Sequence, residues 1–320
     1  MITGFKYWIC LTLFSGLLRL DLAAQPQQVY TGVYLMNIYD LNMDEHSFYT
    51  DFYIWFRWRG DLDPTNFEFV NQIEKWSMTF GISGDEADSL LADGTNYRIY
   101  RVEGRFFHSF LLGRFPLDHH DLDIQIEHPE YTAEEMIFVP DTTQLLIRPS
   151  LKLVGWQDLS ANMRHMIHDY GTDFGKPGAP SQRYSNLSFI VTLKRPVSFF
   201  FLKMFLPLAV VMLVSLGALL LHPSYIDTRS ALPIGGLLTA VFLQQSYSSA
   251  LPDTGYMVLM DKIYLLAYVL VSLILLQVIA SGNKLRRRAD VEVGRIMRFE
   301  RRMATVYFFL FVTFVLFLCA

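Results

Sequence analysis

The chain has 320 residues, of which 52% are hydrophobic and 18% are charged, and its mean hydropathy is +0.25. Soluble domains carry about 25% charged residues, so this composition favours a protein that lies partly in a membrane. The net charge of −4 excludes a nucleic-acid binder that depends on overall basicity, so no nucleic-acid partner is expected. The two cysteines, Cys10 and Cys319, stand at opposite ends of the chain, which excludes a disulfide framework and a structural zinc site.

The charges are distributed unevenly along the chain. Residues 25–196 hold 24 acidic and 14 basic residues, a net charge of −10, whereas residues 281–302 hold 3 acidic and 8 basic residues, a net charge of +5. Two regions of opposite charge indicate that the chain lies in two environments.

Residues 1–24 have the pattern of a secretory signal peptide. Lys6 supplies a positive start, residues 7–18 form an apolar core, and Ala23 and Ala24 supply a small-residue cleavage site. This core is shorter than the roughly 20 residues that a membrane span needs. We therefore predict that the segment directs export and is cleaved near Ala24.

The exported part, residues 25–196, alternates between apolar and polar residues in short stretches. Three of these stretches have the following apolar residues on one face: Phe48, Phe52, Ile54, Phe56 and Trp58; Leu122, Ile124 and Ile126; Leu187, Phe189, Val191 and Leu193. The opposite face of the second stretch carries Asp121, Asp123, Gln125 and Glu127. A period of two without a long helical period predicts an extracellular all-β antiparallel sandwich. The Gly- and Pro-rich segment 169–185 is expected to be a loop or a hairpin tip.

Four later runs are long and apolar enough to cross a membrane. One such run could be a buried core helix, but four in succession predict a membrane domain at 197–320. We expect helices at 197–221, 226–251, 261–281 and 302–320, with a short basic linker at 282–301. Export of residues 25–196 places this linker in the cytoplasm, in agreement with the positive-inside rule.

Several short motifs occur in a fixed order. The sequence FPLD at 115–118 precedes an alternating strand. Trp58-Arg59 stands before it, and four further motifs follow it along the chain: Gly155-Trp156, Arg195-Pro196, Pro207 and Leu251-Pro252. Over about residues 28–320 this set resembles the pentameric ligand-gated ion channels, the Cys-loop receptor superfamily. The two cysteines that bracket the FPLD loop in animal receptors are absent, and the linker at 282–301 is short, as in bacterial members.

The resemblance implies a homopentamer around a central pore that is lined by the second transmembrane helix. It implies a ligand- or pH-gated ion channel rather than an enzyme, with no cofactor. We expect a multi-pass protein of the bacterial inner (plasma) membrane, embedded in the lipid bilayer with its N-terminal domain outside. The agonist is expected to be a small molecule, with amines among the candidates, or protons.

One face of the second span carries small and apolar residues that are followed by polar residues at its end. At about 100° per residue, this face carries Ala231, Gly235, Leu238, Phe242, Gln245 and Ser249. Rings of Leu238 and Phe242 in a pentamer would form a hydrophobic gate that closes by dewetting. The alternative is that these two side chains pack against neighbouring spans.

Charge at the end of the pore is expected to set ion selectivity. Asp227 lies just before this span, where cation-conducting members of the family have an acidic ring, and the Pro-Ala-Arg pattern of anion-selective members is absent. We therefore expect monovalent cations to permeate.

Coupling between the two halves is assigned by resemblance to Asp118 and Arg195, with Pro252, Asp253 and Tyr256 on the receiving loop. The alternative is that these are solvated loop residues. Aromatic residues near expected loops are the candidates for the agonist site: Trp76, Tyr131, Tyr170, Phe174 and Tyr184. Each of them could equally be a core residue.

Histidine titrates near neutral pH, and His119 and His120 beside the FPLD loop are the candidates for pH sensing. A metal site that uses both is disfavoured, because adjacent strand residues point to opposite faces.

Two other classes of function compete with a channel. One is a membrane-anchored oligomeric receptor or enzyme whose spans only hold an exported β-sandwich and conduct nothing. The other is a transporter. Four spans with no internal repeat and no mid-membrane charge pair argue against it. An anchor helix would need no polar stripe with Gln245 and Ser249.

Overall fold

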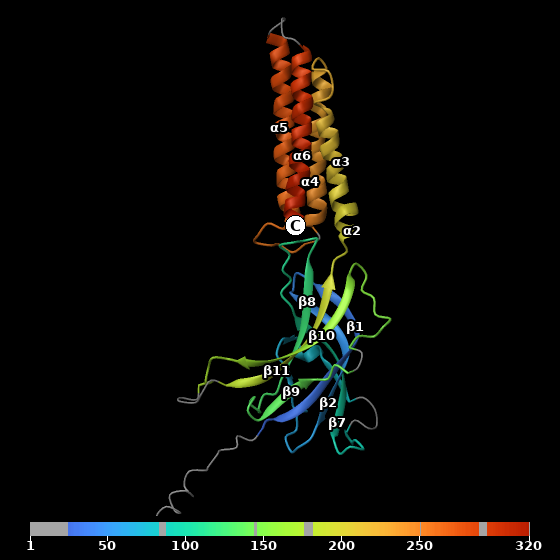
Figure 1. Cartoon of the computed structure of the whole chain (residues 1–320), viewed down its shortest axis with the longest axis vertical. Helices are drawn as coiled ribbons and strands as arrows, with labels where there is room; N and C mark the ends of the chain where they lie inside the picture. Colours follow the sequence, from blue (N-terminus) through green and yellow to red (C-terminus); the bar gives the residue numbers. More distant parts are fainter. Residues whose placement is uncertain are drawn as a thin grey trace, which may run out of the picture.

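The computed structural model of the chain describes residues 25–82, 88–143, 146–175, 182–249, 251–287 and 293–319. The expected signal peptide at 1–24 lies outside the described residues. A β-sheet-rich domain occupies one end of the elongated molecule, and a bundle of long helices occupies the other end (Figure 1).

Two sheets build the β domain. The larger has the strand order β4-β7-β2-β1-β9, with β5 and β6 also paired to β7, and the smaller has the order β10-β11-β8-β3. The strands of the larger sheet are β1 (Gln27–Asn42), β2 (Ser47–Trp58), β4 (Gln72–Ile73), β5 (Thr79–Ile82), β6 (Asp88–Leu90), β7 (Asn96–Phe107) and β9 (Met136–Pro140). Those of the smaller sheet are β3 (Glu68–Phe69), β8 (His119–Glu127), β10 (Gln157–Asp169) and β11 (Arg183–Lys194). All described strand pairs are antiparallel except β1 with β9, which is parallel because β9 returns to the edge of β1 after a crossover.

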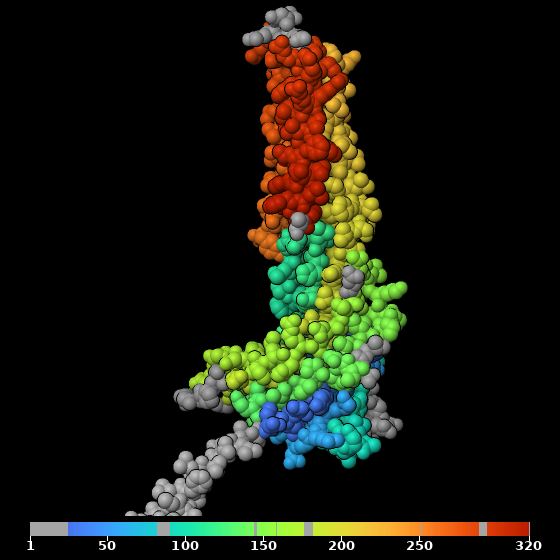
Figure 2. All heavy atoms as spheres, in the orientation of Figure 1, coloured from blue at the N-terminus to red at the C-terminus, as the bar shows by residue number. Residues whose placement is uncertain are grey.

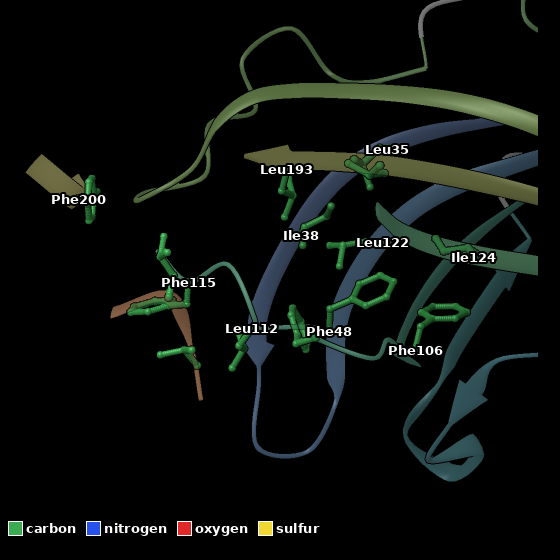
Figure 3. Close-up of a cluster of buried hydrophobic side chains, with 14 of the residues drawn as sticks. Leu35, Ile38, Phe48, Phe106, Leu112, Phe115, Leu122, Ile124, Leu193 and Phe200 are labelled. Carbon is green, nitrogen blue, oxygen red and sulfur yellow. The ribbon is translucent and has the colours of Figure 1, made fainter. Parts of the chain in front are cut away.

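The expected alternation of buried and exposed residues is confirmed in the strands. Leu122 and Ile124 on β8 and Leu193 on β11 are buried, and they meet Leu35 and Phe106 from the larger sheet in the core between the sheets (Figure 3). The period of two places every second side chain in this core.

The second end of the molecule holds four helices that are long and apolar enough to cross a membrane. The first consists of α2 (Val197–Phe199), the π-helical turn η2 (Phe200–Phe205) and α3 (Leu206–Gly217). The π-helical turn lies just before Pro207, which has no backbone N–H to donate to the preceding turn. The other three helices are α4 (Ile226–Ser248), α5 (Leu259–Arg287) and α6 (Val293–Cys319).

Helices α5 and α6 extend further than the apolar runs do. Both continue into residues 282–301, which the sequence assigns to the linker between the last two spans. Hydrophobicity delimits the part of a helix that suits the membrane, whereas backbone hydrogen bonding delimits the helix itself. Lys284, Arg286 and Arg287 in the last turn of α5 also interact favourably with the helix dipole.

The two ends of the molecule share one apolar core. Phe115, from the loop that precedes β8, and Phe200, from η2, belong to the same buried cluster as the sandwich interior (Figure 3). Figure 2 shows the loop before β8 lying directly against the end of the helical bundle. This junction carries the first part of the site.

Candidate functional site

The loop before β8 is joined to the start of the first membrane helix by an ion pair. Arg195 Nε donates to Asp118 Oδ1 at 2.9 Å, and Arg195 Nη2 donates to Asp118 Oδ2 at 3.3 Å. The guanidinium also lies over the rings of Trp156 and Phe115, 4.5 and 5.0 Å from their centroids. The structure thus brings together the two residues predicted to couple the halves, in a mostly buried setting.

The same loop touches two other parts of the helical bundle. The backbone N–H of Leu112 donates to the hydroxyl of Tyr256 at 3.0 Å, and Arg114 donates to the backbone carbonyl of Cys319 at 3.3 Å. Pro252 and Asp253 lie in the same connection as Tyr256, between α4 and α5. Of the three residues predicted on the receiving loop, Tyr256 therefore makes the direct contact with the loop before β8.

One of the two candidate pH sensors belongs to this junction. His120 is buried, and its Nε2 lies 2.8 Å from Asp118 Oδ2, whereas His119 is exposed because adjacent strand residues point to opposite faces. Burial by itself raises the pKa of Asp118, but the hydrogen bonds from His120 and Arg195 outweigh it and hold this pKa below its ordinary value. Asp118 is therefore a stable carboxylate at neutral pH.

The predicted pore face of α4 is uncovered along its whole length. All six predicted residues are exposed, and Leu238 and Phe242 are exposed to 59% and 65%. The opposite side of α4 is buried against the other helices through Pro233, Gly236, Ala240 and Tyr247. Many large apolar side chains elsewhere on the bundle are also exposed. The predicted pore face of α4 differs from them because it ends in polar residues.

The first turn of α4, at the end of the bundle away from the β domain (Figure 1), carries two opposite charges that point in different directions. Asp227 is exposed and lies one helical turn before Ala231, on the uncovered face. Arg229 is 0% exposed and is held inside the bundle, where its Nη2 donates to Glu300 Oε1 at 2.6 Å. The burial of Arg229 was not predicted from the sequence.

Three of the five aromatic candidates meet on the β10–β11 hairpin. The ring centroid of Tyr170 lies 5.2 Å from that of Phe174 and 5.9 Å from that of Tyr184. Phe174 is largely exposed, whereas Tyr184 is buried. Among the described residues, no ring contact joins Trp76 or Tyr131 to this cluster, since Trp76 is 86% exposed on the short helix η1 (Lys75–Ser77) and Tyr131 stacks on His128.

A buried glutamate lies beneath this aromatic cluster. Glu127 is 2% exposed and accepts hydrogen bonds from the Tyr170 hydroxyl at 2.8 Å and from Asn186 Nδ2 at 2.8 Å, and its Oε1 lies 2.7 Å from His168 Nδ1. Burial and the charge of Glu127 raise the pKa of both Tyr170 and Tyr184, so both phenols stay neutral. The result is a negative charge behind aromatic rings.

The sequence reasoning missed Glu127 because it assigned this residue to the face of β8 opposite the core. The β10–β11 hairpin covers the end of β8 and buries the carboxylate through His168 and Tyr170. No local signal marks this burial, since the partners His168 and Asn186 lie 41 and 59 residues further along the chain.

The described residues contain no group of three or more His, Cys, Asp or Glu side chains that could hold a metal ion. No protein-family profile matches the chain. Two curated proteins are similar to it. A gamma-aminobutyric acid receptor subunit beta from Lymnaea stagnalis is 24% identical over 183 residues, which cover 56% of this chain and 35% of the relative. A pH-sensitive chloride channel 2 from Anopheles gambiae is 22% identical over 173 residues, which cover 54% of this chain and 28% of the relative.

These relatives and the fold agree with the resemblance that the motifs predict. The chain is a distant homologue of Cys-loop channel subunits. The matches span about a third of each relative's length, so they bear on part of those proteins only. The structure has the architecture expected from this similarity, a β-sandwich followed by four helices long and apolar enough to cross a membrane, which indicates a multi-pass membrane protein. One relative is named as a receptor subunit and the other as a channel, which supports a channel rather than an enzyme.

The relatives leave two of the sequence-based predictions unsupported. One of them is named as a chloride channel, so the comparison does not support the predicted preference for cations. Both come from animals, so the predicted bacterial membrane also stays a prediction.

Proposed function

We propose that the chain is one subunit of a homopentameric channel that opens in response to an extracellular ligand or to protons. Residues 25–196 would form the extracellular ligand-binding domain, and residues 197–320 would form the membrane domain. The observation that carries this proposal is the uncovered face of α4, which runs from Asp227 to Ser249 with polar residues at both ends. Five such faces around an axis would make a continuous pore lining.

The middle of this face would form the gate. Leu238 and Phe242 are one turn apart and both point away from the other helices of the chain. Rings of large apolar side chains expel water from a narrow pore, which stops ions without a physical plug. Small residues on the same face at Ala231 and Gly235 would leave the inner half wider.

We propose cation selectivity on the basis of the charges at the inner mouth. The carboxylate of Asp227 is exposed on the pore face, while the guanidinium of Arg229 is removed from it. Five carboxylates would lower the local potential for cations and raise a barrier for anions. The chloride channel among the relatives makes this a point for direct measurement.

The aromatic cluster with Glu127 beneath it would receive the agonist. Tyr170, Phe174 and Tyr184 offer ring faces, and each ring attracts a cation by about 0.5–2 kcal/mol. The buried carboxylate of Glu127 adds a negative charge, so the site favours an organic ammonium ion. His168 contacts both Glu127 and Tyr170, so its imidazole is part of the same site.

Current recordings from purified protein in planar bilayers test the proposal. We expect currents during a scan of external pH and a panel of small amines, and we expect Tyr170→Phe to raise the amine concentration needed for half-activation. Failure to conduct under every condition would favour the competing reading, a membrane-anchored receptor or enzyme that uses its spans only as an anchor.

A further inference from the structure

Arg229 is the largest side chain in the described structure that is completely buried in the membrane bundle. Its guanidinium donates to groups from three other segments: to the backbone carbonyl of Ala218 after α3 at 2.7 Å, to Ser281 Oγ on α5 at 3.3 Å and to Glu300 Oε1 on α6 at 2.6 Å. Only Glu300 among these partners carries a charge. The pair therefore depends on a single carboxylate from the last helix.

The position of Arg229 matters because of its neighbour two residues earlier. Residues two apart on a helix are separated by about 200°, so Asp227 and Arg229 point in nearly opposite directions. Asp227 faces the proposed pore, and Arg229 faces the bundle. The charge at the inner mouth is thus set by where the guanidinium is held.

Without Glu300 the guanidinium would be a buried charge without a partner. Such a charge is strongly unfavourable in a protein interior, and a long arginine side chain can move its head toward water. Arg229 lies in the first turn of α4, at the end of the helix that carries Asp227. A released guanidinium would move toward the water at this end of the bundle, beside the mouth of the proposed pore.

We propose that Glu300 determines the ion selectivity of the channel by holding Arg229 away from the pore mouth. Glu300 contacts no permeant ion and acts as a positioning residue. With Glu300 in place the mouth has five Asp227 carboxylates; without it, five guanidinium groups would offset them. Glu300 Oε2 is buried without a hydrogen-bond partner among the described residues, so Arg229 is the group that compensates this carboxylate. The inference rests on the proposed function, because it requires α4 to line a pore.

Reversal potentials in asymmetric KCl across a planar bilayer test this role. Wild type is expected to prefer K⁺. Glu300→Gln should lower the K⁺-to-Cl⁻ permeability ratio several-fold, while the double variant R229Q/E300Q should restore the wild-type preference, since no guanidinium is left to release. A merely structural role for Glu300 would not produce a shift that removal of Arg229 reverses.

Gly294→Lys supplies a matched control on the same helix. Gly294 is exposed, and a side chain there would meet open space. This variant raises the net charge of each subunit by one, the same change that Glu300→Gln makes by removing a carboxylate. We expect its reversal potential to equal that of wild type. An equal shift in Gly294→Lys would overturn the proposal by making net charge the cause.

Two further outcomes would overturn the proposal. One is a Glu300→Gln channel with the wild-type reversal potential, and the other is an R229Q/E300Q channel with the same shift as Glu300→Gln. If Glu300→Gln does not assemble, Glu300→Asp takes its place. It keeps the charge but shortens the reach, so it should give a smaller shift in the same direction, and a wild-type value would contradict the role. Wild type that does not conduct K⁺ would instead overturn the proposed function.

Discussion

Two arginine–carboxylate pairs lie at opposite ends of the helical bundle, and their surroundings differ. The outer pair, Arg195 with Asp118, joins the loop before β8 to the start of the first membrane helix, and Asp118 has a second partner in His120. The inner pair, Arg229 with Glu300, joins two helices of one bundle and is more deeply buried.

The difference indicates two separate tasks. The outer pair connects two parts of the molecule, so a change in one part can be transmitted to the other. The inner pair joins helices and keeps the guanidinium of Arg229 away from the face of α4 that we propose to line the pore. We therefore expect damage to the outer pair to affect gating first, and damage to the inner pair to affect stability first.

The largest loss of stability is expected from Arg229→Met. This change leaves the Glu300 carboxylate buried without a charged partner, which costs about 3–5 kcal/mol. The double variant R229M/E300M should recover most of the loss, because packed apolar side chains can replace a buried ion pair. Thermal unfolding in detergent, with the intact oligomer followed by size exclusion, measures both. Equal losses in the single and double variants would contradict the assigned pairing.

Arg195→Gln is expected to cost less stability but most of the gating response. Asp118 keeps its hydrogen bond with His120, so we expect a loss of about 1.5–3 kcal/mol, the value of a hydrogen bond to a charged group. Evoked current, normalised to the amount of protein in the membrane, should fall to a small fraction of wild type. Arg195→Lys, which keeps the charge but not the planar stacking on Trp156, should be intermediate. A wild-type response from Arg195→Gln would remove this pair from the coupling role.

The pH dependence of the outer pair follows from the lowered pKa of Asp118. A carboxyl whose folded pKa is below its unfolded value contributes stability above the unfolded pKa, and loses it as the pH falls through the folded pKa. The unfolded value is about 3.9, so the stability difference between wild type and Asp118→Asn should stay constant from pH 8 to about pH 5 and shrink below about pH 4. Thermal unfolding across this range measures it, with Asp253→Asn as an exposed control. A difference that shrinks between pH 7 and 5 would contradict the assigned protonation.

The smallest effect is expected from Tyr256→Phe at the outer junction. The variant removes one hydrogen bond, from the backbone N–H of Leu112, and should cost about 0.5–1.5 kcal/mol. The half-activating concentration should rise modestly, while the maximal current remains. Tyr225→Phe removes an exposed hydroxyl at the other end of the bundle and should change neither quantity. Equal behaviour of the two variants would exclude a contribution from the Tyr256 contact.

The fold could be predicted largely because local patterns decide its elements. The alternation at 122–126 and at 187–193 places strands with a buried face, and the length of the apolar runs places four helices. The continuation of α5 and α6 into residues 282–301 could not be predicted in this way, because charged residues in a helix end leave no apolar periodicity.

The candidate site divides in the same way. One helical period suffices to put six residues on one face of α4, and whether this face lines a pore stays a prediction. The burial of Glu127 and Arg229 depends on partners far along the chain, since His168 is 41 residues from Glu127 and Glu300 is 71 residues from Arg229. No local pattern carries such information. Asp118 and Arg195, 77 residues apart, were within reach only through the resemblance.

Accessibility of the α4 face to a charged thiol reagent tests most directly whether this face lines a pore. In a background without Cys10 and Cys319, Ser249→Cys and Leu238→Cys place a thiol on the uncovered face, and Ala240→Cys places one on the buried face. We predict that the reagent changes the evoked current through the first two variants and leaves the Ala240→Cys current unchanged. A pore lined by α4 would be contradicted if the reagent left the currents of the two exposed variants unchanged, or if no variant gave any current.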